Sequence, residues 1–135
     1  MTVSQLNEQY PTCETHHVKS VELKITAQDV LNRLRWLIDE CDDARFVGEF
    51  DHYSHSLGQG PEYLNASIKD ARCVLFCLGH QLEKLNDLAL CPQSIGICET
   101  DDTIDIIYLL SPQKEHNEII DEWINLSMQA EERIH

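Results

Sequence analysis

The chain has 135 residues, a length that supports one domain around a single hydrophobic core. Hydrophobic residues make up 42% of it and charged residues 25%, so the composition is that of a globular protein and excludes a wholly disordered chain. Acidic residues outnumber basic ones by 24 to 10. The resulting net charge of −14 argues against a protein that binds nucleic acid or anionic membranes by neutralising phosphates.

Two further features favour a cytoplasmic protein that is not attached to a membrane. No apolar run approaches the roughly 20 residues that are needed to cross a bilayer. Residues 1–9 carry neither the basic patch nor the apolar stretch of a signal peptide. We therefore expect the protein to be cytoplasmic.

The first part of the chain predicts an arm, a strand and a helix. Residues 1–17 are polar and lack periodicity, so we expect a flexible N-terminal arm and a single folded domain over residues 18–135. Apolar and polar residues then alternate over 20–25, which is typical of a half-buried strand. Thr26 opens a helix over 27–41, with an acidic residue three positions later that resembles the second half of a capping box.

The middle of the chain predicts a second strand and a central helix. Residues 44–57 alternate in the way of a strand and run into a loop that contains glycine and proline. The pattern then turns helical over 62–90. The stretch 71–78 is apolar nearly all round, which favours a helix buried on most sides.

The last third of the chain predicts a β-hairpin over 94–110 and a helix with a broad apolar arc over 115–132. The element order is therefore strand, helix, strand, helix, strand, strand, helix. We expect an α+β fold in which a single mixed sheet of about four strands carries three packed helices. Its first strand–helix–strand unit would be a right-handed crossover if the two strands are parallel neighbours.

The six cysteines are expected to be reduced thiols, because no export signal places the chain in an oxidising compartment. Cys73 and Cys77 lie in an apolar stretch, where we expect them to be small core residues. No pair has the spacing of a redox motif or a zinc knuckle. The cysteines are Cys13, Cys41, Cys73, Cys77, Cys91 and Cys98.

Catalytic motifs are not visible in the sequence. It contains no nucleophile elbow, P-loop or dinucleotide fingerprint, and we nominate no catalytic residue, metal ligand or cofactor. On a strand, His52 and His55 would point to opposite faces and could not share a metal ion. A weaker alternative function is a small-molecule-binding or enzymatic domain with a pocket near Tyr53, His55 and Tyr108.

The strongest remaining signal is an acidic run at the end of the first helix. Asp39, Glu40, Asp42 and Asp43 follow one another where the helix dipole prefers cations, so these charges are locally unfavourable. Trp36 falls on the polar side of the same helix, and tryptophan is enriched among interface anchors. Residues that are unfavourable for local stability are often found at functional sites.

These observations lead to one main hypothesis and a second alternative. The main hypothesis is a small acidic interaction protein that binds a basic partner through Trp36 and the acidic run. It would act in the manner of an inhibitor, an immunity protein or a nucleic-acid mimic. The alternative is a homodimer in which the C-terminal helix and Trp36 form the subunit interface, with no charge-specific partner.

Overall fold

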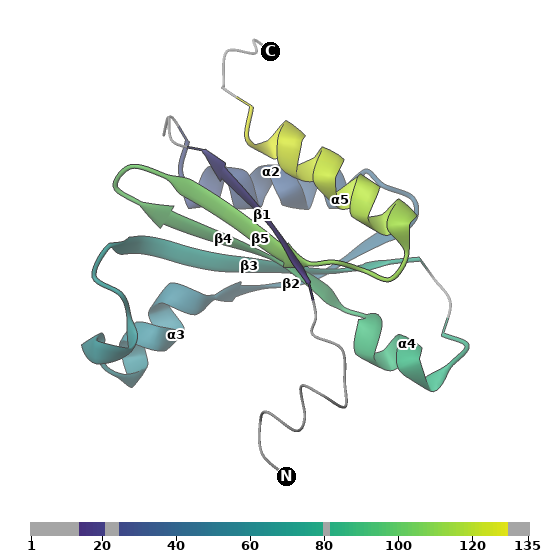
Figure 1. Cartoon of the computed structure of the whole chain (residues 1–135), viewed down its shortest axis with the longest axis horizontal. Helices are drawn as coiled ribbons and strands as arrows, with labels where there is room; N and C mark the ends of the chain where they lie inside the picture. Colours follow the sequence, from purple (N-terminus) through teal and green to yellow (C-terminus); the bar gives the residue numbers. More distant parts are fainter. Residues whose placement is uncertain (1–13, 21–24, 80–81, 130–135) are drawn as a thin grey trace.

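The computed structural model describes residues 14–20, 25–79 and 82–129, and these form a five-stranded antiparallel sheet with four α-helices (Figure 1). The strand order is β1-β5-β4-β3-β2. The strands are β1 (Thr15–Ser20), β2 (Ala44–Asp51), β3 (Ile68–Leu78), β4 (Gln93–Thr100) and β5 (Ile104–Leu109). The helices are α2 (Ala27–Asp39), α3 (His52–Gln59), α4 (Leu85–Leu90) and α5 (Lys114–Ser127), with a short 3₁₀ helix at Pro61–Tyr63.

The α+β class is confirmed, whereas the details of the sheet differ from those expected. Every strand pair is antiparallel, so the sheet is not mixed. The described residues contain five strands and four α-helices, one more of each than predicted. Strands β1 and β2 lie at opposite edges of the sheet, so the predicted crossover between parallel neighbours is absent.

The N-terminal prediction is shifted along the chain. Strand β1 begins at Thr15, inside the segment expected to be an arm, and pairs with β5 over its whole length. Residues 21–24, most of the predicted first strand, lie outside the described residues, as do residues 1–13 of the arm.

Helix α2 forms where its sequence predicts it. The side chain of Thr26 accepts a hydrogen bond from the backbone N–H of Asp29, whose carboxylate accepts from the N–H of Thr26, and this completes the capping box. A second carboxylate reaches the same helix end from the sheet. Oε1 of the buried Glu99 on β4 accepts the N–H of Ala27 at 2.8 Å.

The predicted central helix over 62–90 is wrong. Residues 68–78 form strand β3, and among the described residues that follow it in this segment only the six of α4 are helical. Side chains of β3 alternate between the two sheet faces, with Val74, Phe76 and Leu78 buried against the helix layer. Because the other face of β3 is also largely apolar, the period of two is hidden in a continuous apolar run.

The second predicted strand is correct only up to Asp51. The carboxylate of Asp51 accepts hydrogen bonds from the N–H and the hydroxyl of Ser54 and thereby caps α3. His52 and His55 therefore lie on a helix, and not on opposite faces of a strand.

The main core lies between one face of the sheet and the pair α2 and α5 (Figure 1). Leu31, Leu34 and Ile38 of α2 are fully buried there. The ring of Trp123 on α5 meets that of Phe76 edge to face, with 5.4 Å between the centroids. In Figure 1, α3 and α4 lie on the other side of the sheet, at its two ends.

The expectation that all cysteines are reduced is also wrong. Cys77 at the end of β3 and Cys91, directly after α4, form a disulfide. Cys41, Cys73 and Cys98 are free thiols.

Candidate functional site

Trp36 is the most exposed aromatic residue of the helix layer, with 62% of its surface accessible to solvent. It lines a groove of about 410 Å³ between α2 and α5. We call this the helix groove. The residues that line it are Asn32, Arg33, Trp36, Leu37, Leu126 and Gln129.

The helix groove is held in place at the end of α5. Nη1 of Arg33 donates hydrogen bonds to the carbonyl oxygens of Ser127 at 3.0 Å and Gln129 at 2.8 Å. These carbonyls lie at and just beyond the C-terminal end of α5, where no further N–H group of the helix can bond to them. Arg33 supplies the missing hydrogen bonds and thereby holds α2 against α5. Leu37 and Leu126 supply apolar walls.

Acidic residues gather at one end of the helix groove. Asp39 and Glu40 are exposed and lie one turn after Trp36, on the same side of α2. Glu122 lies one turn before Leu126 on α5. Because the two helices run in opposite directions (Figure 1), these positions fall toward the same end of the groove.

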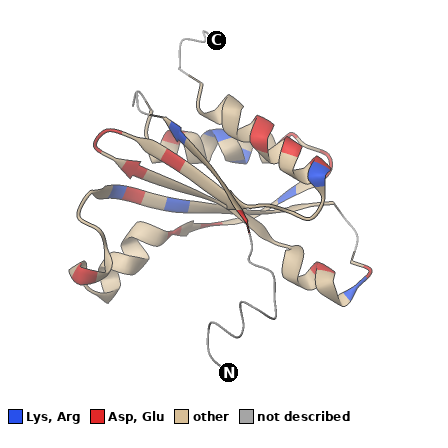
Figure 2. Cartoon of the chain, in the orientation of Figure 1, with Lys and Arg blue, Asp and Glu red and all other residues tan. Residues whose placement is uncertain are grey.

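The other two residues of the predicted acidic run follow directly in the chain. Asp42 and Asp43 are exposed in the turn between α2 and β2, and the carbonyl of Asp43 accepts the N–H of Gly79 at 2.8 Å. Figure 2 shows acidic residues both in this turn and along α5. The last turn of α2 contains no basic residue to offset them. The five residues predicted to bind a partner therefore lie at the end of α2 and in the turn that follows it.

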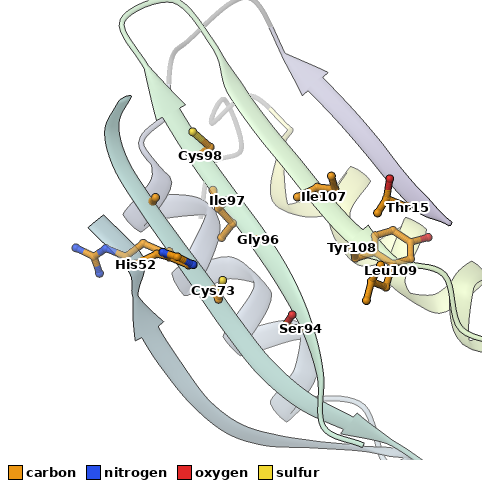
Figure 3. A pocket seen from close by; sticks show the side chains of 12 residues that line it. Thr15, His52, Cys73, Ser94, Gly96, Ile97, Cys98, Ile107, Tyr108 and Leu109 are labelled. Carbon is orange, nitrogen blue, oxygen red and sulfur yellow. The ribbon is translucent and has the colours of Figure 1, made fainter. Parts of the chain in front are cut away.

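A second hollow lies on the open face of the sheet, opposite α2 and α5 (Figure 3). Its volume is about 360 Å³. Cys73, Gly96, Cys98, Ile107 and Leu109 form most of its apolar floor. We call this hollow the sheet cavity. Sequence analysis did not find it, since the residues of β3 that contribute to it were assigned to a helix.

The thiols in the sheet cavity are poor nucleophiles. Burial raises the pKa of the Cys73 thiol above its ordinary value. Burial also raises the pKa of Cys98, and the nearby carboxylates of Asp105 and Asp70 raise it further. Both groups are therefore held as neutral thiols rather than thiolates.

The structure does not gather Tyr53, His55 and Tyr108 around one cavity. Tyr53 and His55 lie on α3, and neither lines the sheet cavity, although their neighbour His52 does. Tyr108 also lines the cavity, but its hydroxyl donates to Asp121 on α5, on the helix side of the sheet. These three residues therefore do not form a common pocket lining.

The described residues offer neither a metal cluster nor a membrane-spanning helix. Within residues 14–20, 25–79 and 82–129, no cluster of three or more His, Cys, Asp or Glu side chains is arranged to hold a metal ion. Over the same residues, no helix has the length and apolar character needed to cross a membrane.

Comparison with known proteins places the chain in a family. A family profile matches residues 1–129, which is nearly the whole sequence. The chain belongs to the family of unknown function DUF6858. No curated protein matches it. The family assignment names no ligand or activity, so an argument about function rests on the surfaces described above.

Proposed function

We propose that this DUF6858 protein is a binding module that takes a basic, partly apolar protein segment into the helix groove. The observation that carries the proposal is the exposure of Trp36 in a groove that Leu37 and Leu126 also line, one turn before the carboxylates of Asp39 and Glu40. Asp39, Glu40, Asp42 and Asp43 form the acidic part of the site. Such a module could act as an inhibitor, as an immunity-type protein or as a nucleic-acid mimic, in each case by binding a basic partner.

Physical chemistry supports this use of the helix groove. An exposed tryptophan ring can bury a large apolar surface against a partner and can also stack against a lysine or arginine side chain. Carboxylates one turn away would pair with the same cations. The net charge of −14 would speed the approach of a basic partner at low ionic strength.

The test uses a defined probe, a fluorescein-labelled amphipathic peptide of leucine and lysine. Fluorescence anisotropy is measured across a salt series, with a peptide in which glutamate replaces lysine as the reference. We expect the lysine peptide to bind and to weaken as the salt concentration rises, whereas the glutamate peptide does not bind.

Matched variants separate the helix groove from the general charge of the chain. The variant D39N/E40Q removes two charges beside Trp36, and D101N/D102N removes two from the β4–β5 turn. We expect at least a tenfold loss of affinity for D39N/E40Q and for Trp36→Ala, and a much smaller loss for D101N/D102N and for the exposed aromatic control Tyr63→Ala. Equal losses for the two charge variants, or unchanged binding by Trp36→Ala, would refute the proposal.

A further inference from the structure

The short helix α4 exposes leucines that the fold itself does not use. Leu85 is 81% exposed and Leu88 is 62% exposed, and none of the six residues of α4 is buried. Leu82, just before the helix, is 67% exposed. Leucines in a surface helix normally face the core, so this pattern needs a separate explanation.

One α4 leucine, Leu90, lies in an apolar groove that joins the sheet cavity. A groove between α4 and the end of β5 is lined by Leu90, Leu109 and Leu110, among others. Leu109 and Ser94 line both this groove and the sheet cavity, so the two hollows are continuous. We use the name apolar strip for these two hollows together with the exposed leucines of α4 and the preceding Leu82. Its exposed large side chains are Leu82, Leu85, Leu88, Leu90, Ile107, Leu109 and Leu110.

The size of the apolar strip matches one side of a stable interface. Burying a fully exposed leucine side chain removes about 100 Å² of apolar surface from water, so the exposed fractions of the strip amount to roughly 400 Å². A standard interface buries about 800 Å² per partner, of which a little over half is apolar. The strip therefore supplies roughly the apolar area that such an interface requires.

The charge of the chain limits where two copies can meet. Two copies with a net charge of −14 repel one another, and an uncharged surface is where they can meet with least repulsion. The seven large side chains of the strip carry no charge. The acidic residue within α4, Asp87, accepts the backbone N–H groups of Glu83 and Lys84 and so caps its own helix.

This side of the molecule carries both a protruding helix and a hollow. Helix α4 protrudes on the side of the sheet that carries the sheet cavity, and the disulfide between Cys77 and Cys91 ties its base to β3 (Figure 1). A two-fold interface uses the same patch on both subunits, so each protrusion can fill the hollow of the other. We infer that the protein forms a symmetric homodimer in which α4 of each copy packs on the sheet cavity of its partner.

Light scattering coupled to size-exclusion chromatography tests this dimer over about a hundredfold range of protein concentration. We expect the wild type to be dimeric and L85Q/L88Q to be monomeric, at least tenfold weaker in self-association, with the circular dichroism spectrum of the wild type because both positions are exposed. The control W36A/L126Q removes two exposed apolar side chains from the opposite side of the molecule and should remain dimeric.

A mixing experiment tests the reciprocal geometry. The variant I107Q/L109Q changes two exposed positions of the cavity and should also be monomeric. Mixed with L85Q/L88Q, it should form a heterodimer, because one intact α4 then faces one intact cavity. A monomeric wild type, a dimer that persists in L85Q/L88Q, or a mixture that stays monomeric would overturn the inference. None of these outcomes depends on whether the helix groove binds a basic peptide.

Discussion

The hydroxyl of Tyr108 donates a 2.7 Å hydrogen bond to Oδ1 of Asp121, and this bond joins the sheet to the helix layer. Tyr108 is buried on β5, whereas Asp121 is partly exposed on α5. Nε2 of His16 on β1 lies 3.5 Å from the same carboxylate oxygen. Burial of the hydroxyl, together with its bond to Asp121, raises the pKa of Tyr108 well above the ordinary value of 10.0.

The raised pKa predicts a loss of stability in alkali. Above pH 10 the unfolded chain releases the Tyr108 proton, whereas the folded chain retains it. The contribution of Tyr108 to the free energy of unfolding is therefore complete below the ordinary tyrosine pKa, and it falls as the pH rises above that value. We expect the free energy of unfolding, measured with urea between pH 8 and pH 11, to fall at the upper end, and to fall less steeply in Tyr108→Phe.

The same variant should be less stable at neutral pH. A hydrogen bond to a charged group contributes about 1.5–3 kcal/mol, and partial exposure of Asp121 reduces this, so we expect Tyr108→Phe to lose about 1–2 kcal/mol. Tyr63→Phe, an exposed tyrosine outside the core, is the control and should change stability by less than about 0.5 kcal/mol. Equal behaviour of the two variants would contradict a structural role for the Tyr108 hydroxyl.

Local patterns predicted those elements whose two sides differ in polarity. Helix α2, helix α5 and the β4–β5 hairpin were all recovered from periodicity and turn residues. Strand β3 was missed because its two faces are both largely apolar. Helix α3 was missed because the Asp51 cap that begins it lies within an alternating pattern. In both places the sequence is compatible with two structures, and tertiary contacts decide between them.

The two candidate sites also differ in whether the sequence could predict them. Trp36 and its acidic neighbours lie on α2 and in the turn that directly follows it, so their closeness in the sequence was enough to place them together. The sheet cavity combines β3, β4 and β5 with residues from α3 and β1, and the strand order that brings these together is a long-range property. The disulfide between Cys77 and Cys91 depends on the same packing.

Glu99 is one acidic residue that we expect to stabilise the fold. Its side chain is buried on β4 and accepts the N–H of Ala27 in the first turn of α2, where a carboxylate also suits the helix dipole. We expect Glu99→Ala to lower the free energy of unfolding by about 1–3 kcal/mol, because it leaves a buried N–H without its acceptor. Glu99→Gln keeps an acceptor oxygen and should lose less.

Urea denaturation measures this effect, with Asp102→Ala as the control. Asp102 lies in the same hairpin but is exposed, so its loss should change stability by less than about 0.5 kcal/mol. A loss for Glu99→Ala no larger than that for Asp102→Ala would show that the bond to Ala27 does not stabilise α2.

Truncation should destabilise the fold at one leucine position and leave its stability nearly unchanged at another. Leu34 of α2 is fully buried, and Leu34→Ala should lower the free energy of unfolding by about 2–5 kcal/mol through lost burial and a residual cavity. Leu88 of α4 is exposed, so Leu88→Ala should leave monomer stability within about 0.5 kcal/mol. The comparison is made by denaturation of each variant in the I107Q/L109Q background, which we expect to be monomeric, so that self-association does not contribute. A large loss for Leu88→Ala would mean that α4 packs on its own core.

The two tryptophans should differ in their accessibility to a quencher. Trp36 is 62% exposed, whereas Trp123 is 5% exposed and packs against Phe76. Acrylamide should therefore quench the emission of the wild type in two components, and Trp36→Phe should remove the accessible one. A single buried component in the wild type would show that Trp36 is covered in solution.

Reduction of the disulfide should destabilise the fold around α4. The bond joins Cys77 and Cys91 across 14 positions of the chain, and closing a loop of about 15 residues contributes roughly 3 kcal/mol in the chain-entropy model. We expect Cys91→Ser to lower the free energy of unfolding by about 2–4 kcal/mol. The wild type should lose a similar amount in dithiothreitol, whereas Cys91→Ser should show no further change. Cys41→Ser, which removes a free thiol, is the control and should retain the response of the wild type to dithiothreitol. A wild type whose unfolding is the same with and without dithiothreitol would indicate that the two sulfurs are not joined in solution.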